Sequence, residues 1–437
     1  MSQNIKIIIL LSITMSLFGC GSGSKSDSKK NSGINSNNPD YEKYVAENYS
    51  EITSLIDDEN YDDLQQLSEK IGSHRIVQLG ESTHGSKQMN QVKTRLIKYL
   101  HQYHDFNVIS FESSAFSCNM QLEKNENIDA ESLTKSCVYG IWRTKEVKEL
   151  FAYILQTQST DRPLHLSGFD IKFSSNSDNK ENLIEFYSKT AEQYGLINSV
   201  DIDGFAELIV SYNNARKGCY VNDNSQDCAF LKNSYSDSRV SIEVFRDSFL
   251  GDEPQLQLAR IIANSYLFLI EETSQSSIDV AIYIREQGMA ETFTELATYY
   301  WTEEKVIVWA HNAHVAESNY SQDSELGMGY YLDDYWQDEL YTIGLYMIKG
   351  ESANNYKESI KVTSHAINSL EILAQSVNKG IIFLPFTSKN EPGTEDDWLH
   401  VEATNKHWGV RNQQTILADA YDAVIVVENS TIPDYLN

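Results

Sequence analysis

The stretch that decides the fold is Arg75-Ile-Val-Gln-Leu-Gly80-Glu81-Ser-Thr-His84-Gly85-Ser86. Its apolar beginning predicts a short buried strand that ends at Gly80. A helical period of three and four residues follows Gly85, carried by Met89, Val92, Leu96, Ile97 and Leu100. Glu81 and His84 therefore belong to a strand-to-helix turn at the carboxyl end of a strand, which is where open α/β sheets bind their ligands.

Glu81 and His84 are the first candidate site residues. A carboxylate within reach of an imidazole holds the ring in one tautomer and raises its basicity. The same spacing also fits a polar turn in which His84 only caps the helix. The choice between the two readings depends on what the other strands carry at the same end.

Three further apolar runs are followed by ionisable groups. Residues 107–112 end at Glu112, residues 164–170 end at Asp170, and residues 306–310 are followed by His311 and His314. In a parallel sheet the carboxyl ends of the strands share one edge, so these side chains should converge there. Four strands with this property favour a common site over scattered surface charges.

The order of strand and helix patterns predicts an α/β fold. Apolar runs return at 340–345, 381–384 and 423–427, and helical patterns cover 145–156 and 287–300. This alternation is typical of a mostly parallel central sheet flanked by helices on both faces. Residues 174–278, rich in Ser, Asn, Asp and Tyr with helical patches, interrupt it and are expected to form a helical insertion that serves as a candidate lid.

Composition and motifs narrow the function. The formal net charge of −28 argues against nucleic acid, whose phosphates require Lys and Arg, and against broad contact with an anionic membrane surface. The sequence contains no Gly-x-Ser-x-Gly elbow, no phosphate-binding P-loop and no dinucleotide fingerprint. Histidines with carboxylates remain, a set that either activates water as a general base or binds a metal.

The N-terminus has the features of a targeting segment. Lys6 is followed by an apolar run over residues 7–17 and then by Leu17-Phe-Gly-Cys20. This order resembles the lipobox of bacterial lipoproteins, which implies removal of residues 1–19 and acylation of Cys20; a plain secretory signal with a chance Cys is the alternative. By resemblance to the sorting rule of Gram-negative envelopes, Gly21 after the Cys favours the outer membrane, so we expect a lipid-anchored envelope protein that faces the periplasm.

Residues 20–40 have no apolar period and are expected to be a flexible tether before a hydrolytic domain at 41–437. Four other cysteines remain in the mature chain, and an oxidising compartment favours disulfides. We expect the local pairs Cys219–Cys228 and Cys118–Cys137, with two other connectivities open. The absence of a CxxC motif from the sequence argues against a structural zinc site.

The candidate motifs resemble the erythromycin esterase family in order and spacing, over roughly residues 45–430. The matching segments are Gly80-Glu81-Ser-Thr-His84-Gly85, Phe111-Glu112, Gly168-Phe-Asp170, Arg285-Glu286 and Trp309-Ala-His311-Asn-Ala-His314. The resemblance implies metal-independent, general-base hydrolysis of an ester or lactone, with antibiotic resistance among the roles it allows. His84 would be the base, Glu81 would orient it, and His311 and His314 would assist proton transfer or stabilise the oxyanion.

The same resemblance implies a set of supporting residues. Substrate binding or transition-state support is expected from Lys93, Glu112, Asp170, Arg285 and Glu286. Arg285 and Glu286 also fit an ion pair that starts a helix. Lys93 and Gln88 stand where macrolide esterases carry Arg and Glu, so the resemblance supports hydrolysis more than it supports a macrolide substrate.

Two other functions stay open. The first is a metal-dependent hydrolase that uses the N and O ligands Glu81, His84, Glu112, Asp170, His311 and His314. The second is a catalytically inactive binding lipoprotein. The favoured reading has no cofactor and no metal, and its partners are a small-molecule ester or lactone and the membrane that holds the lipid anchor. The remaining histidines are expected to be structural or exposed: His74, His101, His104, His165, His365, His400 and His407.

Overall fold

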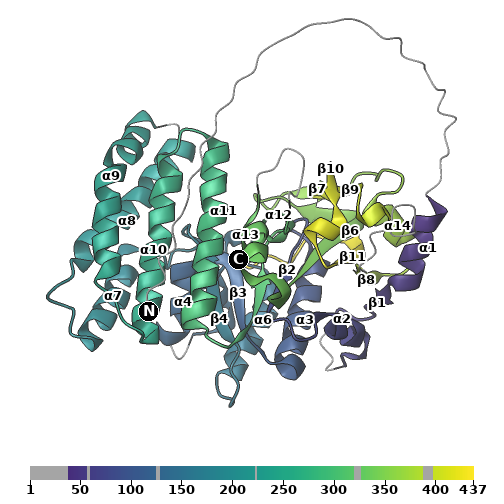
Figure 1. The fold of residues 1–437 in the computed structure, drawn as a ribbon, viewed down its shortest axis with the longest axis horizontal. Coiled ribbons are helices and arrows are strands. Elements are labelled where there is room, and N and C mark those ends of the chain that lie inside the picture. The colour runs from purple at the N-terminus through teal and green to yellow at the C-terminus, as the bar shows by residue number, and fades with distance from the viewer. Residues whose placement is uncertain (1–37, 57–59, 125–127, 222–223, 319–325, 387–396) are drawn as a thin grey trace, which may run out of the picture. The chain divides into compact units, whose positions relative to one another are not determined.

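The computed structural model describes residues 38–56, 60–124, 128–221, 224–318, 326–386 and 397–437 (Figure 1). The expected signal peptide, Cys20 and nearly all of the expected tether lie outside these residues. The first described helix, α1 (Pro39–Asn48), is capped by the side chain of Asn38, which accepts a hydrogen bond from the Asp40 amide. It already includes the last two residues assigned to the tether.

The described residues form a nine-stranded sheet in the order β1-β8-β11-β6-β2-β5-β3-β4, with β7 beside β6. A separate hairpin pairs β9 with β10. The strands are β1 (Ser50–Glu51), β2 (Ile76–Leu79), β3 (Phe106–Ser114), β4 (His165–Asp170), β5 (Lys305–Trp309), β6 (Leu340–Ala353), β7 (Ser359–Lys361), β8 (Ile381–Pro385), β9 (Glu402–His407), β10 (Arg411–Ile416) and β11 (Ala423–Ser430).

The sheet is mostly parallel, as the sequence predicts. Each of the pairs β11–β6, β6–β2, β2–β5, β5–β3 and β3–β4 is parallel. The antiparallel pairs are β8 with β11, β1 with β8, and β7 with β6. The carboxyl ends of β2, β5, β3 and β4, which are neighbours in the sheet, therefore point to the same edge.

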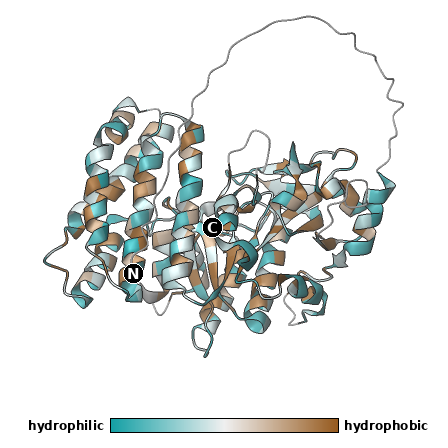
Figure 2. Cartoon of the chain, viewed as in Figure 1, coloured by the Kyte–Doolittle hydropathy of each residue, from teal (hydrophilic) through white to brown (hydrophobic). Residues whose placement is uncertain are grey.

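Helices cover both faces of the sheet, because successive strand side chains point to opposite faces. On β5, Ile307 and Trp309 join a core with the helices α3 (Lys87–His104) and α6 (Lys145–Thr157). Val306 and Val308 join a second core with α11 (Ile278–Glu295), α13 (Met328–Trp336) and α14 (Leu370–Gln375). Figure 2 shows hydrophobic colouring on the strands and on parts of the helices beside them.

The segment between β4 and β5 is helical. It contains α7 (Lys180–Gln193), α8 (Ile202–Arg216), α9 (Ser225–Asp247) and α10 (Pro254–Ser274), and these helices stand beside the sheet in Figure 1. A third core holds them together, and in it the rings of Phe205 and Phe245 stack at 3.7 Å between centroids. The next helix, α11, begins at Ile278, earlier than the expected start at residue 287.

The remaining helices are short. They are α2 (Gln65–Ile71), α4 (Ala115–Lys124), α5 (Ala130–Cys137), α12 (Asn312–Val315) and α15 (Leu417–Ala420). In the part of the chain that the structure describes, no helix is both long and apolar enough to span a membrane.

Candidate active site

The turns after β2 and β5 pack directly on each other at the edge of the sheet. A Cβ at Gly80 would lie 2.2 Å from Oδ1 of Asn312, so only glycine allows this approach. The Asn312 side chain is itself fixed, because it donates to the Leu345 carbonyl oxygen (3.0 Å) and accepts from the Leu345 amide (3.1 Å). The contact brings the rings of His84 and His311 to 5.0 Å between centroids.

His84 is oriented by a buried carboxylate. Its Nδ1 lies 2.7 Å from Oε1 of Glu81, and Trp142 Nε1 donates to the same oxygen at 2.7 Å. A carboxylate at neutral pH accepts hydrogen bonds only, so the proton of a neutral His84 ring is on Nδ1. Nε2 is then the basic nitrogen, and the ring lines a cavity.

Lys93 lies behind Glu81 and has no exposed side-chain surface. Its Nζ is 2.7 Å from Oε2 of Glu81 and 4.3 Å from the centre of the Trp309 ring. Burial raises the pKa of Glu81, but Lys93 and His84 outweigh this effect and hold the pKa below its ordinary value. Burial lowers the pKa of Lys93 to about 8 although Glu81 opposes it. Lys93 therefore supports Glu81 and is not among the residues that line the cavity.

His314 is held between two carboxylates. Its Nε2 lies 3.1 Å from Glu112 Oε1, and its Nδ1 lies 2.8 Å from Glu286 Oε1. Burial lowers the pKa of His314, but the two carboxylates outweigh it and raise the pKa to about 10. Burial likewise raises the pKa of Glu112, which His314 and Arg285 pull well below its ordinary value. His314 is thus an imidazolium at neutral pH.

Arg285 supplies a second fixed cation. Its Nη2 lies 2.6 Å from Asp170 Oδ2 and 3.1 Å from Glu112 Oε1. Tyr139 also donates its hydroxyl proton to Asp170 (2.8 Å), so this carboxylate positions both residues. Arg285 and Glu286 lie inside α11 and bind different partners, so the alternative of a helix-starting ion pair is wrong.

His311 differs from His314 although both follow β5. The Ala313 amide donates to Nδ1 of His311 at 3.0 Å, which places the proton of the neutral ring on Nε2. Burial, together with the nearby imidazoles of His84, His407 and His314, lowers the pKa of His311 well below its ordinary value. The edge of the sheet therefore presents a basic imidazole, a neutral imidazole and an imidazolium.

A cavity of about 550 Å³ joins these groups, which is within the usual size of a small-molecule site. Its lining contains four of the predicted residues besides His84, namely Glu112, Arg285, His311 and His314. Glu81, Asp170 and Glu286 are buried behind it and contact the lining residues, and Lys93 is buried with them and contacts Glu81. The sheet thus brings all the predicted catalytic and supporting residues together, in two layers.

A family model described as erythromycin esterase matches residues 101–430, three quarters of the chain. The chain belongs to the erythromycin esterase family. The protein named "Putative hydrolase YbfO" from Bacillus subtilis (strain 168) is 30% identical over 389 residues, which cover 84% of this chain and 86% of that protein. Erythromycin esterase type II of Escherichia coli is 21% identical over 359 residues, which cover 78% and 85%.

Solved structures share the family fold. A Bacillus cereus protein matches with a TM-score of 0.73 and 18% identity, covering 91% of this chain and 98% of that one. A variant of the erythromycin esterase EreC in its open conformation matches with a TM-score of 0.63 and 18% identity, covering 89% and 99%. At this level of identity the likeness shows the fold alone.

Trp142, His407 and Trp408 are among the residues of this family member's cavity that were missed from the sequence. His407 was expected to be structural or exposed, but its ring centre lies 5.0 Å from that of His311. Trp408 stacks on His311 at 5.6 Å, and its amide donates to the Ser82 carbonyl oxygen at 2.9 Å. His407 and Trp408 lie where β9 ends and the turn to β10 begins. Both strands are polar and lack the apolar alternation from which a strand is predicted.

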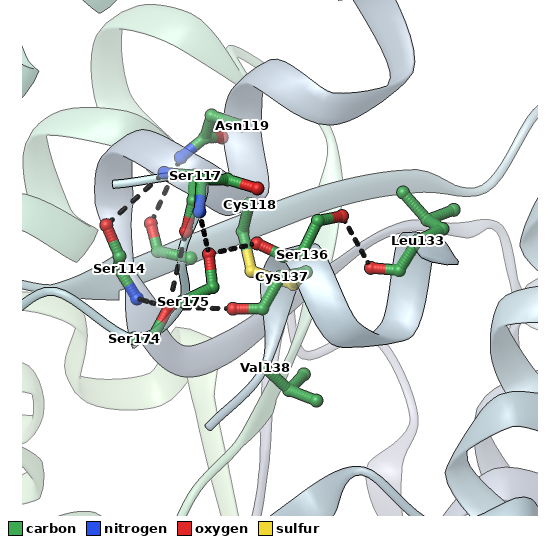
Figure 3. The surroundings of a disulfide bond; sticks show 12 residues. Ser114, Ser117, Cys118, Asn119, Leu133, Ser136, Cys137, Val138, Ser174 and Ser175 are labelled. Atoms are coloured by element: carbon green, nitrogen blue, oxygen red, sulfur yellow. Dashed lines mark hydrogen bonds between the residues drawn. A yellow bond between two sulfur atoms is a disulfide. The ribbon is translucent and has the colours of Figure 1, made fainter. Parts of the chain in front are cut away.

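A disulfide supports the wall that contains Trp142 (Figure 3). Cys118 of α4 is bonded to Cys137 at the end of α5, and the chain reaches the cavity at Tyr139. The Ser174 hydroxyl donates to the Cys137 carbonyl oxygen at 2.8 Å and fixes the same segment. The second expected local pair, Cys219–Cys228, is also bonded in the structure and lies in the helical insertion.

The acidic groups of the site are engaged by cations of the protein. Lys93 pairs with Glu81, Arg285 pairs with Asp170, and Glu112 contacts both Arg285 and His314. Within the described ranges, no group of three or more His, Cys, Asp or Glu side chains has an arrangement that fits a metal ion. Gln88 forms hydrogen bonds with Thr431 and does not line the cavity, so the cavity wall does not lack a carboxylate at this position.

Proposed function

We propose that the protein hydrolyses a carboxylic ester or lactone by attack of a water molecule that His84 activates. The observation that carries the proposal is the 2.7 Å contact between His84 Nδ1 and Glu81 Oε1 at the wall of the cavity. It fixes the tautomer in which Nε2 is basic and places a negative charge beside the imidazolium that forms during proton transfer. Membership of the erythromycin esterase family supports the same chemistry.

The reaction follows from this arrangement. His84 Nε2 takes a proton from water as the water oxygen bonds to the carbonyl carbon. The carbonyl oxygen becomes negative, and Arg285 and the His314 imidazolium face the same cavity, where they stabilise the negative charge. The neutral His311 adds a donor at Nε2. The carbon–oxygen ester bond then breaks, and His84 returns its proton to the departing alkoxide, which yields an acid and an alcohol.

The site gains no uncompensated charge during this cycle. The imidazolium of His84 forms against the buried Glu81 carboxylate, which Lys93 already holds in its charged state. In a buried site, fixed charges of this kind act strongly because little water screens them. Hydrolysis by this route uses only groups of the chain, so we expect activity to persist when metal ions are removed.

The test is a panel of p-nitrophenyl esters and lactones, a macrolide among them, assayed with and without a chelator. His84→Asn should lower kcat by about 10²- to 10⁴-fold, since Asn keeps size and polarity but does not accept the proton, while KM changes little. His165→Asn, at the amino end of β4, serves as the matched control and should retain activity. A folded His84→Asn variant with near-parent kcat would remove His84 from the mechanism.

The same panel separates the alternatives. Activity that is lost to the chelator and restored by one added ion would assign the site to a metal-dependent hydrolase. Binding of a panel compound with no turnover would assign it to a binding lipoprotein. Envelope location remains a proposal from the N-terminal pattern: we propose that acylated Cys20 anchors the protein, facing the periplasm, with the outer membrane favoured.

A further inference from the structure

The cavity has a cation that the hydrolytic mechanism does not use. Lys357, together with Asn355, lines the cavity from the turn between β6 and β7. No strand or helix pattern singles out this turn in the sequence. It lines the same cavity as His84, His311 and His314, so a ligand that fills this cavity also meets Lys357.

Lys357 differs from the other cations of the site in its pairing. Arg285, Lys93 and His314 each contact carboxylates, as described above. Among the residues that the structure describes, Lys357 forms no ion pair, and its Nζ lies 4.7 Å from the centre of the Tyr435 ring. The neighbouring Glu358 accepts from the Asn354 side-chain amide at 2.9 Å and so contacts the turn itself. The positive charge of Lys357 is thus available to a ligand.

The turn holds Lys357 in a defined place. Lys357 has a φ of 66°, a left-handed conformation that is uncommon for a non-glycine residue and that recurs at functional sites. The Asn354 side chain accepts from the amides of Tyr356 (2.9 Å) and Glu358 (3.0 Å), which fixes this conformation. At the base of the turn, the Ala353 amide donates to the Gly85 carbonyl oxygen at 2.9 Å. Gly85 follows His84, so this backbone hydrogen bond connects the turn that carries Lys357 to the turn that carries His84.

We propose that Lys357 recognises an anionic group, such as a carboxylate, on the substrate whose ester bond lies at His84. This inference rests on the proposed hydrolysis and adds the class of substrate. The chain carries a formal net charge of −28, so its overall field repels anions. A cation without a carboxylate partner at the cavity gives an anionic substrate a local attraction that a neutral ester does not gain.

The experiment compares esters that differ in one charge. The first pair is mono-p-nitrophenyl glutarate and p-nitrophenyl valerate, and the second pair, 4-acetoxybenzoate and phenyl acetate, places the carboxylate on the leaving alcohol. The measured quantity is the ratio of kcat/KM for the anionic ester to that for the neutral ester. In Lys357→Met we expect the ratio to fall about fivefold in at least one pair, as fits an ion pair formed by an exposed lysine, and Lys357→Arg should restore it.

Lys361→Met is the matched control, because Lys361 is exposed on β7 and does not line the cavity. It should leave both ratios at the parent values. Equal ratios in the parent and in Lys357→Met, for both pairs, would overturn the inference. Loss of the preference in Lys361→Met to the same extent would also overturn it, because the effect would then belong to the general surface charge.

A binding measurement separates this inference from the proposed function. If the parent hydrolyses no ester, the proposed function is wrong. Binding of glutaranilic acid and valeranilide still tests the role of Lys357 in that case. Quenching of the fluorescence of Trp142 and Trp408, which line the cavity, measures both affinities. The inference is supported if the parent binds the acid more tightly than the anilide and Lys357→Met reduces this preference about fivefold. Equal binding of the two compounds by the parent refutes it.

Discussion

Replacement of Lys93 by Met tests how the buried charges support His84. Met is close to Lys in length and apolar, so it fills the space beside Trp309 without the ammonium group. Among the described residues, the Glu81 side chain, which has no exposed surface, then keeps only His84 and Trp142 as partners. Burial raises the pKa of Glu81 with no ammonium to oppose it, and a protonated Glu81 no longer stabilises an imidazolium at His84.

The expected magnitudes follow from the geometry. Removal of one member of a buried ion pair typically costs about 3–5 kcal/mol of unfolding free energy. We expect a loss of about 3 kcal/mol, at the lower end, because Glu81 retains two hydrogen-bond donors. In activity, kcat should fall at neutral pH and recover in part as the pH rises and Glu81 ionises again.

Urea denaturation and initial-rate kinetics of a double-mutant cycle provide the assay. Lys93→Met with Glu81→Gln removes both charges, so its stability should return toward the parent while its kcat stays low. Lys98→Met, on the same helix but over the Tyr153 ring, is the control and should cost about 1–2 kcal/mol, the strength of such a contact at a buried site. A Lys93→Met variant with parent stability and parent kcat would refute the support that we assign to Lys93.

Three further outcomes are expected. The pKa of His314 is raised in the folded protein to about 10, so its contribution to stability is complete below about pH 6.5 and is lost as the pH rises through 10. The difference in unfolding free energy between the parent and His314→Asn, about 4 kcal/mol near neutral pH, should therefore shrink toward pH 10; a constant difference contradicts this. Removal of the Cys219–Cys228 disulfide by replacement of both with Ala should cost roughly 2–3 kcal/mol in the same urea assay, and an unchanged midpoint and slope would contradict that. Cys20→Ser should release the protein from the membrane fraction or leave it unprocessed, whereas parent-like fractionation with cleavage before residue 20 would exclude the anchor.

The sequence predicted which strand-end side chains meet at the site, because the carboxyl ends of parallel strands share one edge of the sheet. Glu81, Glu112, Asp170 and His311 each follow or end a short apolar run, and the alternation of strands with helices was enough to place them together. The order of the strands did not follow from the sequence, since apolar runs of similar length carry no information about which neighbours they pair with.

The places of Lys93, His407 and Trp408 were harder to predict, for physical reasons. Lys93 was expected to serve in substrate binding or transition-state support, yet it follows Met89 by four residues and precedes Ile97 by four on the apolar stripe of α3. That spacing was a signal of burial. His407 and Trp408 had no comparable signal, because the hairpin that carries them places them by docking on Ser82 and not by a periodic apolar face.

The position of β5 has a consequence for how the chain folds. Strands β2 and β3 are successive in sequence, but β5 lies between them in the sheet and is made only after the whole helical insertion. Until β5 arrives, the facing edges of β2 and β3 have unpaired backbone groups, which are sites of aggregation. Contacts between residues that lie far apart in the sequence, such as those of β5 with β2 and β3, form slowly during folding. A chain shortened before residue 305 should therefore form no active site and should aggregate through these open edges, however well its helical insertion folds.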